Sequence, residues 1–426
     1  MVDDLSVEAY MPRVADSLLV EKLSYAGAVE IRGPKWCGKT ETALRHAESA
    51  VMMQDPDERA NNLMVAESKP SLLLRGEKPL LIDEWQEAPQ LWDAVRFAVD
   101  RERMPGQYIL TGSATPYAKP RHSGTGRFSF LDMYPMSSAE AGDSTAEVSL
   151  GALFERPGEI EGVSRSDVEA VSHLICRGGW PGAVTARNGE ASLEMAHDYV
   201  MAIAEEDISR VDGVSRSAQY ARIVMQEYAR CTSTQAAHLA MRKNLKARNT
   251  ELSRDTVDAY IAALRRLYVI RDLPAWEPSL HAKARVAKTP TRHFVDPSLA
   301  AAALGASPRS LLRDLSLCGM LFESLCVRDL RVYAQAHKGE VFHYRDESGL
   351  EADAVVALRD GRYALFEVKM GARFVDEGAR NLIKLSEKID RSVMGEPAFC
   401  AVLTPGGYAL KRPDGVYVVP ITCLAP

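Results

Sequence analysis

Residues 33–40 read GPKWCGKT and match the pattern Gly-x-x-x-x-Gly-Lys-Thr. In such a loop the glycines let backbone N–H groups curl around phosphates, the lysine reaches the β and γ oxygens, and the threonine hydroxyl binds Mg²⁺. The alternative is a glycine-rich turn that merely opens an ordinary helix. We expect a nucleotide to contact Gly33, Pro34, Lys35, Trp36, Cys37, Gly38, Lys39 and Thr40.

Two adjacent carboxylates, Asp83 and Glu84, follow the apolar run in PLLIDEWQ. We expect Asp83 to hold Mg²⁺ through water and Glu84 to orient the attacking water as a base, an arrangement that suits ATP hydrolysis. Alone, such a pair is usually a solvated strand end. Its position about forty residues after the loop favours the catalytic interpretation.

Two further segments could complete this site. The strand-like QYILTGSATP ends in Thr111 and Ser113, and we expect Ser113 to sense the γ-phosphate. HSGTGRFSF places Arg127 after a flexible Gly-Thr-Gly, where it could act as a finger toward a neighbouring subunit's nucleotide. The alternative for Arg127 is a surface arginine on a loop. No Asn-Lys-x-Asp run for guanine is present, so ATP is favoured over GTP.

Strands and helices must position these residues. AVEIR at 28–32 is strand-like and KTETALRHAESA at 39–50 is rich in helix formers, which gives the strand, loop, helix order that the loop requires. The sequence thus predicts an α/β domain with the parallel sheet of P-loop NTPases. Its strands should end at one ligand-facing edge.

These motifs together resemble a large prokaryotic family of predicted ATPases, which have an AAA+-like N-terminal ATPase domain and a C-terminal domain of unknown function. The resemblance covers nearly the whole chain, and it implies nucleotide binding and ATPase activity. Trp36 and Cys37 depart from the small or polar residues usual there, but the backbone binds the phosphates, so we expect binding to survive. The other matching segments are YMPRVADSLL with Arg13, LLIDEWQ, ILTGSA, HSGTGR, RGGWPGAV and FEVKMG. The resemblance implies that Arg13 is a further ATP contact.

The middle of the chain is expected to be helical. We place domain boundaries near 150 and 300, giving an ATPase domain at 1–150, a helical linker and winged helix-turn-helix at 151–300, and a third domain at 301–426. RGGWPGAV, with Gly178, Gly179, Pro181 and Gly182, should be a connection. Three helices are expected over 215–230, 232–240 and a stretch capped by Ser253, followed by strand-like YVIRDLPAW. The first should bury Tyr220, Ile223, Val224 and Tyr228.

The predicted winged helix carries a local excess of positive charge. Residues 241–271 contain eight lysines or arginines against three acids, in a chain whose net charge is −6. Such residues on a recognition helix and wing suit contacts to the phosphates of double-stranded DNA, although a winged helix can also dock proteins. The candidate DNA contacts are Arg242, Lys243, Lys246, Arg254, Arg265 and Arg266, with Lys283, Arg285, Lys288 and Arg292 where a wing would fall.

The last third predicts another α/β domain. A helix over LLRDLSLCGMLFESLCVRDL carries Glu323, EVFHYRD reads as a strand, and a hairpin turns at Asp360-Gly361. This order resembles the nuclease fold of restriction enzymes, in which carboxylates hold Mg²⁺ and a lysine assists the attacking water. A folded module without activity is the alternative. The four implied residues are Glu323, Asp353, Glu367 and Lys369.

Composition is that of an ordinary globular protein, 46% hydrophobic and 26% charged, with seven scattered cysteines expected to be reduced and mostly buried. No apolar run is long enough to cross a membrane, so we expect a cytoplasmic location. The combined prediction is an ATPase, with ATP and Mg²⁺, that forms homo-oligomers through Arg127 and acts on DNA. The alternative is an ATP-gated switch or scaffold that binds proteins through a noncatalytic C-terminal domain.

Overall fold

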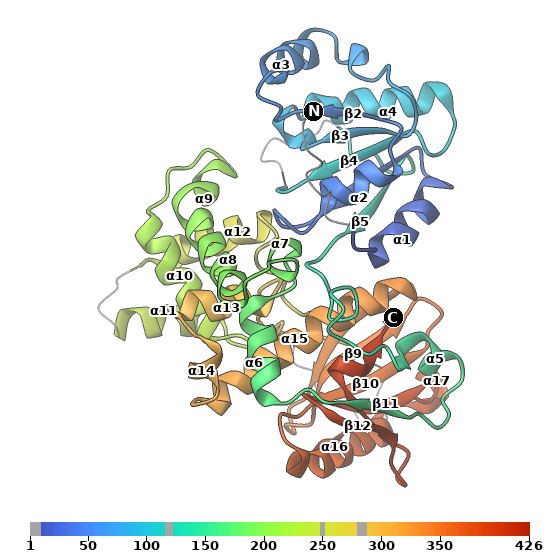
Figure 1. The fold of residues 1–426 in the computed structure, drawn as a ribbon, viewed down its shortest axis with the longest axis vertical. Coiled ribbons are helices and arrows are strands. Elements are labelled where there is room, and N and C mark those ends of the chain that lie inside the picture. The colour runs from blue at the N-terminus through green and yellow to red at the C-terminus, as the bar shows by residue number, and fades with distance from the viewer. Residues whose placement is uncertain (1–9, 116–121, 248–251, 279–287) are drawn as a thin grey trace. The chain divides into compact units, whose positions relative to one another are not determined.

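The computed structural model describes residues 10–115, 122–247, 252–278 and 288–426, and Figure 1 shows its helices and strands. Contacts group the chain into two units, Met1–Met133 and Tyr134–Pro426. This grouping divides the chain only once. The three domains predicted with boundaries near 150 and 300 stay a prediction.

The first unit contains a five-stranded sheet in the order β2-β3-β4-β1-β5, and every pairing is parallel. The predicted mixed α/β class with a parallel N-terminal sheet is therefore confirmed. Its central strands read as continuous apolar runs because a parallel sheet is covered on both faces. The strands are β1 (Ala28–Arg32), β2 (Ser49–Met52), β3 (Leu80–Asp83), β4 (Tyr108–Gly112) and β5 (Phe128–Asp132).

Helices cover both faces of this sheet. On one face, α4 (Gln90–Glu102) buries Trp92 and Val95 against Ile82 of β3 and Leu110 of β4. Successive side chains of a strand point to opposite faces of the sheet. Ile31 and Leu81 point to the other face, where α2 (Lys39–His46) contacts β1, β3 and β4. The remaining helical segments are α1 (Val14–Leu23), α3 (Arg59–Ser68) and the 3₁₀ turns η1 (Pro70–Leu72) and η2 (Trp85–Glu87).

The second unit contains a mixed seven-stranded sheet in the order β7-β12-β13-β11-β10-β9-β8. Strands β10, β11 and β13 run parallel, and the other pairs are antiparallel. A separate short pair joins β6 to β14. The strands are β6 (Val148–Ser149), β7 (Gly162–Ser164), β8 (Gly339–Arg345), β9 (Glu351–Leu358), β10 (Tyr363–Val368), β11 (Phe399–Thr404), β12 (Gly407–Lys411), β13 (Tyr417–Pro420) and β14 (Leu424–Ala425).

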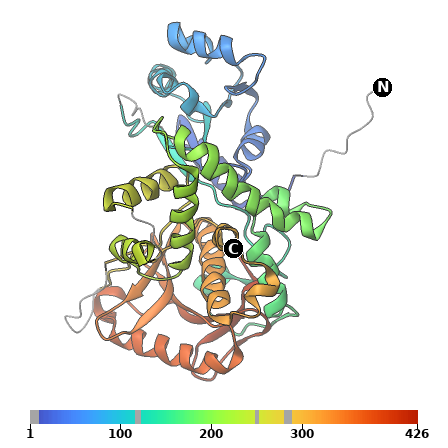
Figure 2. The ribbon, with the colours of Figure 1, turned by 90° about the vertical axis from the view of Figure 1, so that its left-hand side faces the viewer.

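Two long helices pack on this sheet. α16 (Val375–Lys388) buries Leu382 and Leu385 against Val355, Leu365 and Val402, and Figure 2 shows it running along the sheet in orange-red. α15 (Leu315–Ala336) buries most of its residues and contacts β8, β9 and β10.

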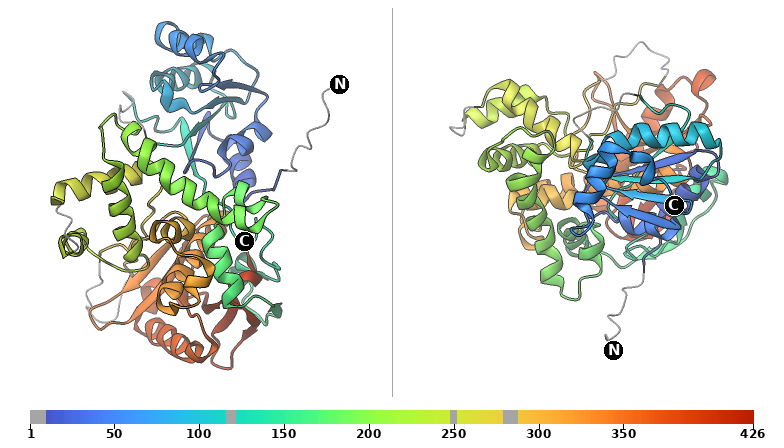
Figure 3. Two further views of the ribbon diagram at one scale, coloured as in Figure 1. Left: turned by 60° about the vertical axis from the view of Figure 1, so that its left-hand side comes forward. Right: turned by 90° about the horizontal axis from the view of Figure 1, so that it is seen from above.

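A second group of helices in this unit packs around α13 (Pro297–Leu304), which contacts α6, α8, α10 and α15 (Figure 3). The helical segments of the unit not yet given are α5 (Leu150–Glu155), α6 (Val168–Arg177), α7 (Pro181–Val184), α8 (Gly189–Ala202), a π-helical turn η3 (Ile203–Asp207), α9 (Ile208–Arg210), α10 (Ala218–Arg230), α11 (His238–Ala247), α12 (Arg254–Arg266), α14 (Pro308–Leu311) and α17 (Arg391–Met394), with 3₁₀ turns η4 (Ala372–Phe374) and η5 (Ile421–Cys423).

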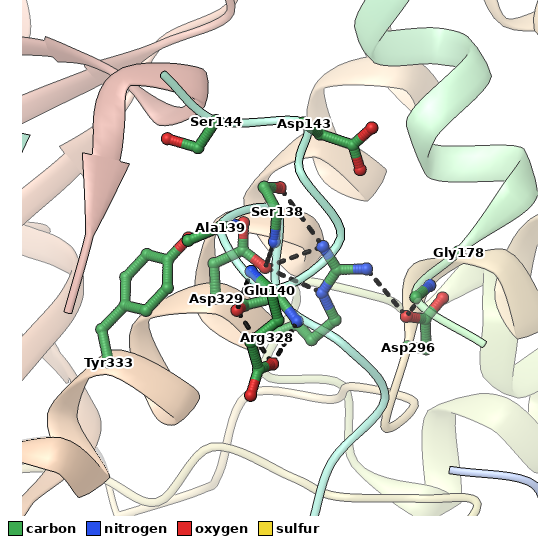
Figure 4. Close-up of polar contacts among 12 residues, drawn as sticks. Ser138, Ala139, Glu140, Asp143, Ser144, Gly178, Asp296, Arg328, Asp329 and Tyr333 are labelled. Atoms are coloured by element: carbon green, nitrogen blue, oxygen red, sulfur yellow. Dashed lines mark hydrogen bonds and ion pairs between the residues drawn. The ribbon is translucent and has the colours of Figure 1, made fainter. Parts of the chain in front are cut away.

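A buried polar network ties the start of the second unit to α15 (Figure 4). The guanidinium of Arg328 donates to Asp296 at 2.9 Å and to Asp329 at 2.7 Å. Asp329 also accepts from the N–H of Ser138 at 3.2 Å, and the hydroxyl of Tyr333 accepts from the next N–H at 3.1 Å. Because these buried charges are paired and hydrogen-bonded, the network fixes residues 138–139 on the helix.

A close backbone approach fixes the same segment one step earlier. The N–H of Met136 donates to the carbonyl of Gly179 at 2.6 Å. A Cβ atom on Gly179 would lie 2.0 Å from the carbonyl oxygen of Met136, so only glycine leaves room for this contact.

Several sequence-based expectations are confirmed. β1 is AVEIR itself, and the hairpin between β9 and β10 turns at Asp360-Gly361, where Gly361 has φ of 92°. Ser253 caps α12 by accepting from the N–H of Thr256. Six of the seven cysteines are buried.

Other expectations are wrong in detail. Tyr220 was expected to be buried on α10, but it is 41% exposed, because Ala221 and Met225 occupy the buried side with Val224 and Tyr228. Pro181 and Gly182 were expected in a connection, yet they belong to α7, where proline suits the first turn. α15 begins only at Leu315, after the separate short α14.

The helices over 215–266 are followed by antiparallel bridges that pair Ile270 with Phe294 and Leu273 with Thr291. This order agrees with a winged helix but does not establish one, so that assignment stays a prediction. Among the helices described, none is long and apolar enough to cross a membrane.

Candidate functional site

The loop after β1 has the curled backbone that its sequence predicts. A Cβ atom on Gly33 would lie 2.2 Å from the carbonyl oxygen of Met133, so this position requires glycine. Gly38 has φ of 99° and Trp36 has φ of 61°. Tryptophan is unusual in that conformation, and its side chain is 67% exposed. The backbone at Trp36 is thus strained within a loop whose N–H groups are expected to bind phosphate.

Two cations support this loop from within. Lys39 is buried, and its Nζ donates to the carbonyl oxygen of Pro34 at 2.7 Å. Arg13, which precedes α1, donates from Nη1 to the carbonyl oxygen of Cys37 at 2.8 Å. The predicted ATP contact Arg13 therefore holds the loop backbone in this structure.

Two threonines, one from the loop and one from β4, hold the predicted metal carboxylate. The Oγ1 of Thr40 donates to Oδ1 of Asp83 at 2.7 Å, and the Oγ1 of Thr111 donates to the same oxygen at 2.6 Å. Thr111 also accepts from the N–H of Glu84 at 3.0 Å. Because β4 lies between β1 and β3, Thr111 holds Asp83 and Glu84 at the carboxyl ends of the strands, the same end at which the loop follows β1.

The predicted base is held by hydrogen bonds to a single oxygen. Oε2 of Glu84 accepts from the hydroxyl of Ser113 at 2.6 Å and from its N–H at 3.3 Å. The side-chain amide of Gln86 donates to the same oxygen. Ser113, predicted as a sensor of the γ-phosphate, thus contacts the predicted base directly.

A buried carboxyl on β1 lies beneath this turn. Glu30 is 6% exposed, and its Oε1 accepts from Nε1 of Trp85 at 2.9 Å. Burial raises the pKa of Glu30 to about 7, against the opposing effects of Arg32 and of the bond from Trp85. The carboxyl fixes the indole and with it the turn that follows Glu84.

Arg127 lies at the amino end of the parallel strands, opposite the end at which the loop follows β1. Its carbonyl accepts from the N–H of Ala28, the first residue of β1, whereas the phosphate-binding loop follows the last. Its Nε donates to Asp100 at 2.7 Å, and this bond lowers the pKa of that carboxyl. The structure therefore does not bring Arg127 together with the loop of the same chain.

The four residues of the predicted nuclease site come close in the second unit. Lys369, just beyond β10, forms an ion pair with Glu367, while Asp353 on β9 accepts from the N–H of Val368 at 2.7 Å. Burial, and then the charge of Asp353, raises the pKa of Glu367 to about 8. Burial and the charges of neighbouring carboxylates raise the pKa of Glu323 well above its usual range.

These side chains do not form a recognisable metal centre. Across the described residues there is no group of three or more His, Cys, Asp or Glu side chains placed to hold a metal ion. Burial also raises the pKa of Asp353, although Lys369 opposes that shift. The cluster is therefore a set of partly or fully buried acids that repel one another around one lysine.

Most arginines predicted to contact DNA already have acidic partners. Arg254 pairs with Asp258 at 3.4 Å, Arg265 with Asp272 at 2.7 Å and Arg266 with Asp212 at 3.9 Å. Arg292 is buried and also pairs with Asp272, at 2.8 Å, while Lys288 pairs with Glu277 at 3.2 Å.

Two lysines on α11 differ from these arginines. Lys243 and Lys246 are exposed, and neither forms an ion pair with any residue that the structure describes. The side chain of Arg242 and the residues Lys283 and Arg285 lie outside the described part of the chain. The positive surface available for DNA is thus smaller than the residue count suggested.

Sequence reasoning assigned no role to Thr111 or to Gln86. Thr111 could have been found, because it ends a strand beside Asp83 and points to the same face. Gln86 gave no such signal, since its direction depends on the left-handed conformation of Glu84, with φ of 53°.

Known families match three parts of the chain. Residues 26–142 match the model of an AAA domain, which supports an AAA-like ATPase in this part. Residues 168–310 and 318–424 match two different domains of unknown function (DUF8612 and DUF4143). Neither description identifies a winged helix or a nuclease fold.

Two curated relatives are described only as uncharacterized proteins, Mb2031c of Mycobacterium bovis and Rv2008c of Mycobacterium tuberculosis. Each is 25% identical over 417 residues, which cover 96% of this chain and 83% of the relative.

Solved structures with some similarity include the Walker-type ATPase PABY2304 of Pyrococcus abyssi, at 14% identity and a TM-score of 0.44, covering 70% of this chain and 97% of that one. A RuvB variant of Thermotoga maritima has 13% identity and a TM-score of 0.25, with coverage of 61% and 89%. These TM-scores are too low to carry an argument.

Proposed function

We propose that the first unit binds Mg-ATP and hydrolyses its terminal phosphoanhydride bond. The observation that carries this proposal is the continuous set of hydrogen bonds from Thr40 through Asp83 and Thr111 to the turn at Glu84. It joins a phosphate-binding loop to a metal carboxylate and a base at the carboxyl ends of three adjacent strands.

In the proposed reaction Lys39 exchanges its neutral partner, the carbonyl of Pro34, for charged phosphate oxygens, which bind an ammonium more strongly. Water attacks the γ-phosphorus while Glu84 accepts a proton from that water. The bond from the γ-phosphorus to the bridging oxygen breaks, leaving ADP and phosphate.

The residues present fit a magnesium ion. The hydroxyl of Thr40 and the carboxylate of Asp83 approach to 2.7 Å, and such oxygen ligands are the ones that Mg²⁺ prefers. When bound, the ion would offset the negative charge that develops on the phosphates.

Two variants test the reaction. Lys39→Ala should abolish ATP binding, whereas Glu84→Gln should retain ATP and lower kcat about a thousandfold. Glu87→Gln is the matched control, because it changes the same group three residues further along the chain, where Glu87 pairs with Arg59. Phosphate release and equilibrium nucleotide binding are the measurements. A wild-type protein that binds no ATP would overturn the proposal.

We propose that hydrolysis in turn works in trans through Arg127. Its place at the edge opposite its own loop supports a role toward another subunit's nucleotide. Mixing Lys39→Ala subunits with Arg127→Ala subunits should then restore hydrolysis. Light scattering with and without ATP measures the accompanying assembly. A mixture that hydrolyses ATP no faster than either variant alone would count against the action of Arg127 in trans.

The proposed target is double-stranded DNA, bound through Lys243 and Lys246 on α11. Affinity should fall as salt rises, and the double variant Lys243→Ala with Lys246→Ala should reduce that salt dependence. Lys384→Ala, which removes an exposed lysine from α16, is the control. Binding that ignores salt would reject the basic surface.

The finer proposal is that the second unit cleaves DNA through Glu323, Asp353, Glu367 and Lys369. Their order along the chain and their electrostatic coupling support it. Incubation of several DNA forms with Mg²⁺ or Mn²⁺ should give cleavage that Asp353→Asn removes. Cleavage that persists in this variant would come from a contaminant.

The alternative function is an ATP-gated switch or scaffold for protein partners. The ion pairs already made by Arg254, Arg265 and Arg266 favour it, because paired arginines are poorer DNA ligands. This alternative expects ATP-dependent assembly without salt-sensitive DNA binding.

A further inference from the structure

Gln86 occupies the middle of η2, the short 3₁₀ turn that follows Glu84. Trp85 fixes this turn on the sheet. Its ring is 2% exposed and lies 4.9 Å from that of Trp92, and its Nε1 donates to Glu30. The direction in which Gln86 leaves the backbone is therefore determined by its neighbours.

A glycine on β4 makes room for the amide of Gln86. A Cβ atom on Gly112 would lie 3.2 Å from Oε1 of Gln86 and 3.2 Å from Nε1 of Trp85, both tight distances. The bare backbone at Gly112 lets the amide lie between Glu84 and Ser113.

The amide completes a triangle with these two residues. Nε2 of Gln86 donates to Oε2 of Glu84 and, at 3.4 Å, to the hydroxyl oxygen of Ser113. A carboxylate only accepts, so the amide must present its NH₂ group to it. The hydroxyl of Ser113 closes the triangle by donating to the same carboxylate oxygen at 2.6 Å.

All these donors reach Oε2, and in the described part of the chain no donor reaches Oε1 of Glu84. Fixing one oxygen of a carboxylate fixes the direction of the other. Oε1 is then the oxygen left to receive a proton from water.

We propose that Gln86 is a positioning residue that holds Glu84 so that Oε1 faces the attacking water. The proposal rests on the ATPase function proposed above. In this arrangement hydrogen bonds hold Oε2 of Glu84, and Oε1 accepts the proton. Gln86 acts through Glu84, so its loss should affect turnover and leave nucleotide binding intact.

The test compares Gln86→Met, which keeps the length of the side chain but removes its donor, with wild type. We expect kcat to fall about 10- to 100-fold, as misplaced catalytic groups do, while the Kd of ATP is unchanged. Gln54→Met is the matched control, because the exposed amide of Gln54 donates to a carboxylate of the same turn, Glu87, at 3.3 Å. That control should keep the wild-type kcat.

A second comparison asks whether Gln86 acts through Glu84. In a Glu84→Gln background, Gln86→Met should cause no further loss, because the base it positions is already gone. An equal loss in both backgrounds, or a wild-type kcat for Gln86→Met, would overturn the inference.

Gln86→Glu is a second variant, which tests the same inference if Gln86→Met fails to fold. It keeps the shape and places a like charge beside Glu84, so kcat should fall at least as far as in Gln86→Met, again at unchanged Kd. A normal kcat in Gln86→Glu would also overturn the inference. If wild type itself hydrolyses no ATP, the proposed function fails instead.

Discussion

Asp83 and Glu84 in the first unit receive hydrogen bonds from hydroxyl and amide groups, whereas the acids of the second unit face one another. Glu367 lies beside Asp353 and has Lys369 as its cation, and burial raises its pKa to about 8. Both clusters were predicted as catalytic.

The difference lies in how each cluster offsets its negative charge. Neutral donors hold carboxylates in place without removing their charge, which suits the metal and base roles proposed for the first cluster. Buried acids that repel one another instead favour protonated forms. A metal ion would relieve that repulsion, but within the described residues no metal group is assembled.

The contrast between the two clusters is tested most directly by removing the repulsion among the acids of the second unit. Glu367 holds a proton in the folded protein at pH values where the unfolded chain releases it, so stability falls as pH rises from a usual glutamate pKa to about 8. Glu367→Gln should abolish a loss on the order of 3 kcal/mol between about pH 5 and pH 8. Urea unfolding at a series of pH values measures it, and equal slopes for both proteins would contradict the account.

The first cluster is tested by removing a neutral donor. Thr111→Val leaves Asp83 and the N–H of Glu84 each without one partner, so we expect kcat for ATP to fall about 100-fold, or about 2.7 kcal/mol. Thr111→Ser should restore most of the rate. Thr145→Val, which removes an exposed threonine bond to Glu147, is the control. Full activity of Thr111→Val would show that these bonds are dispensable.

The basic residues of the second unit allow a similar comparison, between an arginine with an acidic partner and an exposed lysine. Arg265→Ala removes a partner of the half-buried Asp272 and should destabilise the protein by about 1 kcal/mol. Lys243→Ala should leave the free energy of unfolding unchanged and reduce only DNA affinity. Thermal unfolding and DNA titration separate the two effects. A stability loss in Lys243→Ala would mean that this lysine has a structural partner.

The smallest effect is expected at the surface. Arg254 and Asp258 form an exposed pair four residues apart on α12, so Arg254→Ala should cost no more than about 0.5 kcal/mol. A weaker DNA affinity in this variant would show that the pair opens to bind phosphate. Unchanged affinity would favour the switch or scaffold.

Local signals predicted the parts of the fold that depend on neighbouring residues. The strand, loop and helix around Lys39, the cap at Ser253 and the turn at Gly361 each follow from side-chain or backbone preferences within a few residues. The pairing of β7 with β12 joins residues far apart in the sequence, and no local preference specifies such a partner.

The site divides in the same way. Lys39, Thr40 and Asp83 could be assigned because their roles are tied to motif positions. The positions of Gln86 and Arg127 depend on how the chain turns after β3 and on which end of the sheet β5 begins. The charge excess of residues 241–271 overstates the positive charge available to a ligand, because a count of residues omits their ion pairs, such as that of Arg265 with Asp272.

The backbone on each side of Pro135 is held by a hydrogen bond. The N–H of Met133 donates to Arg32, beside the phosphate-binding loop, and that of Met136 is bound to Gly179. Only Tyr134 and Pro135 stand between them, and the proline ring fixes its own φ and restricts the residue before it to extended conformations. The backbone from Met133 to Met136 therefore has little conformational freedom of its own.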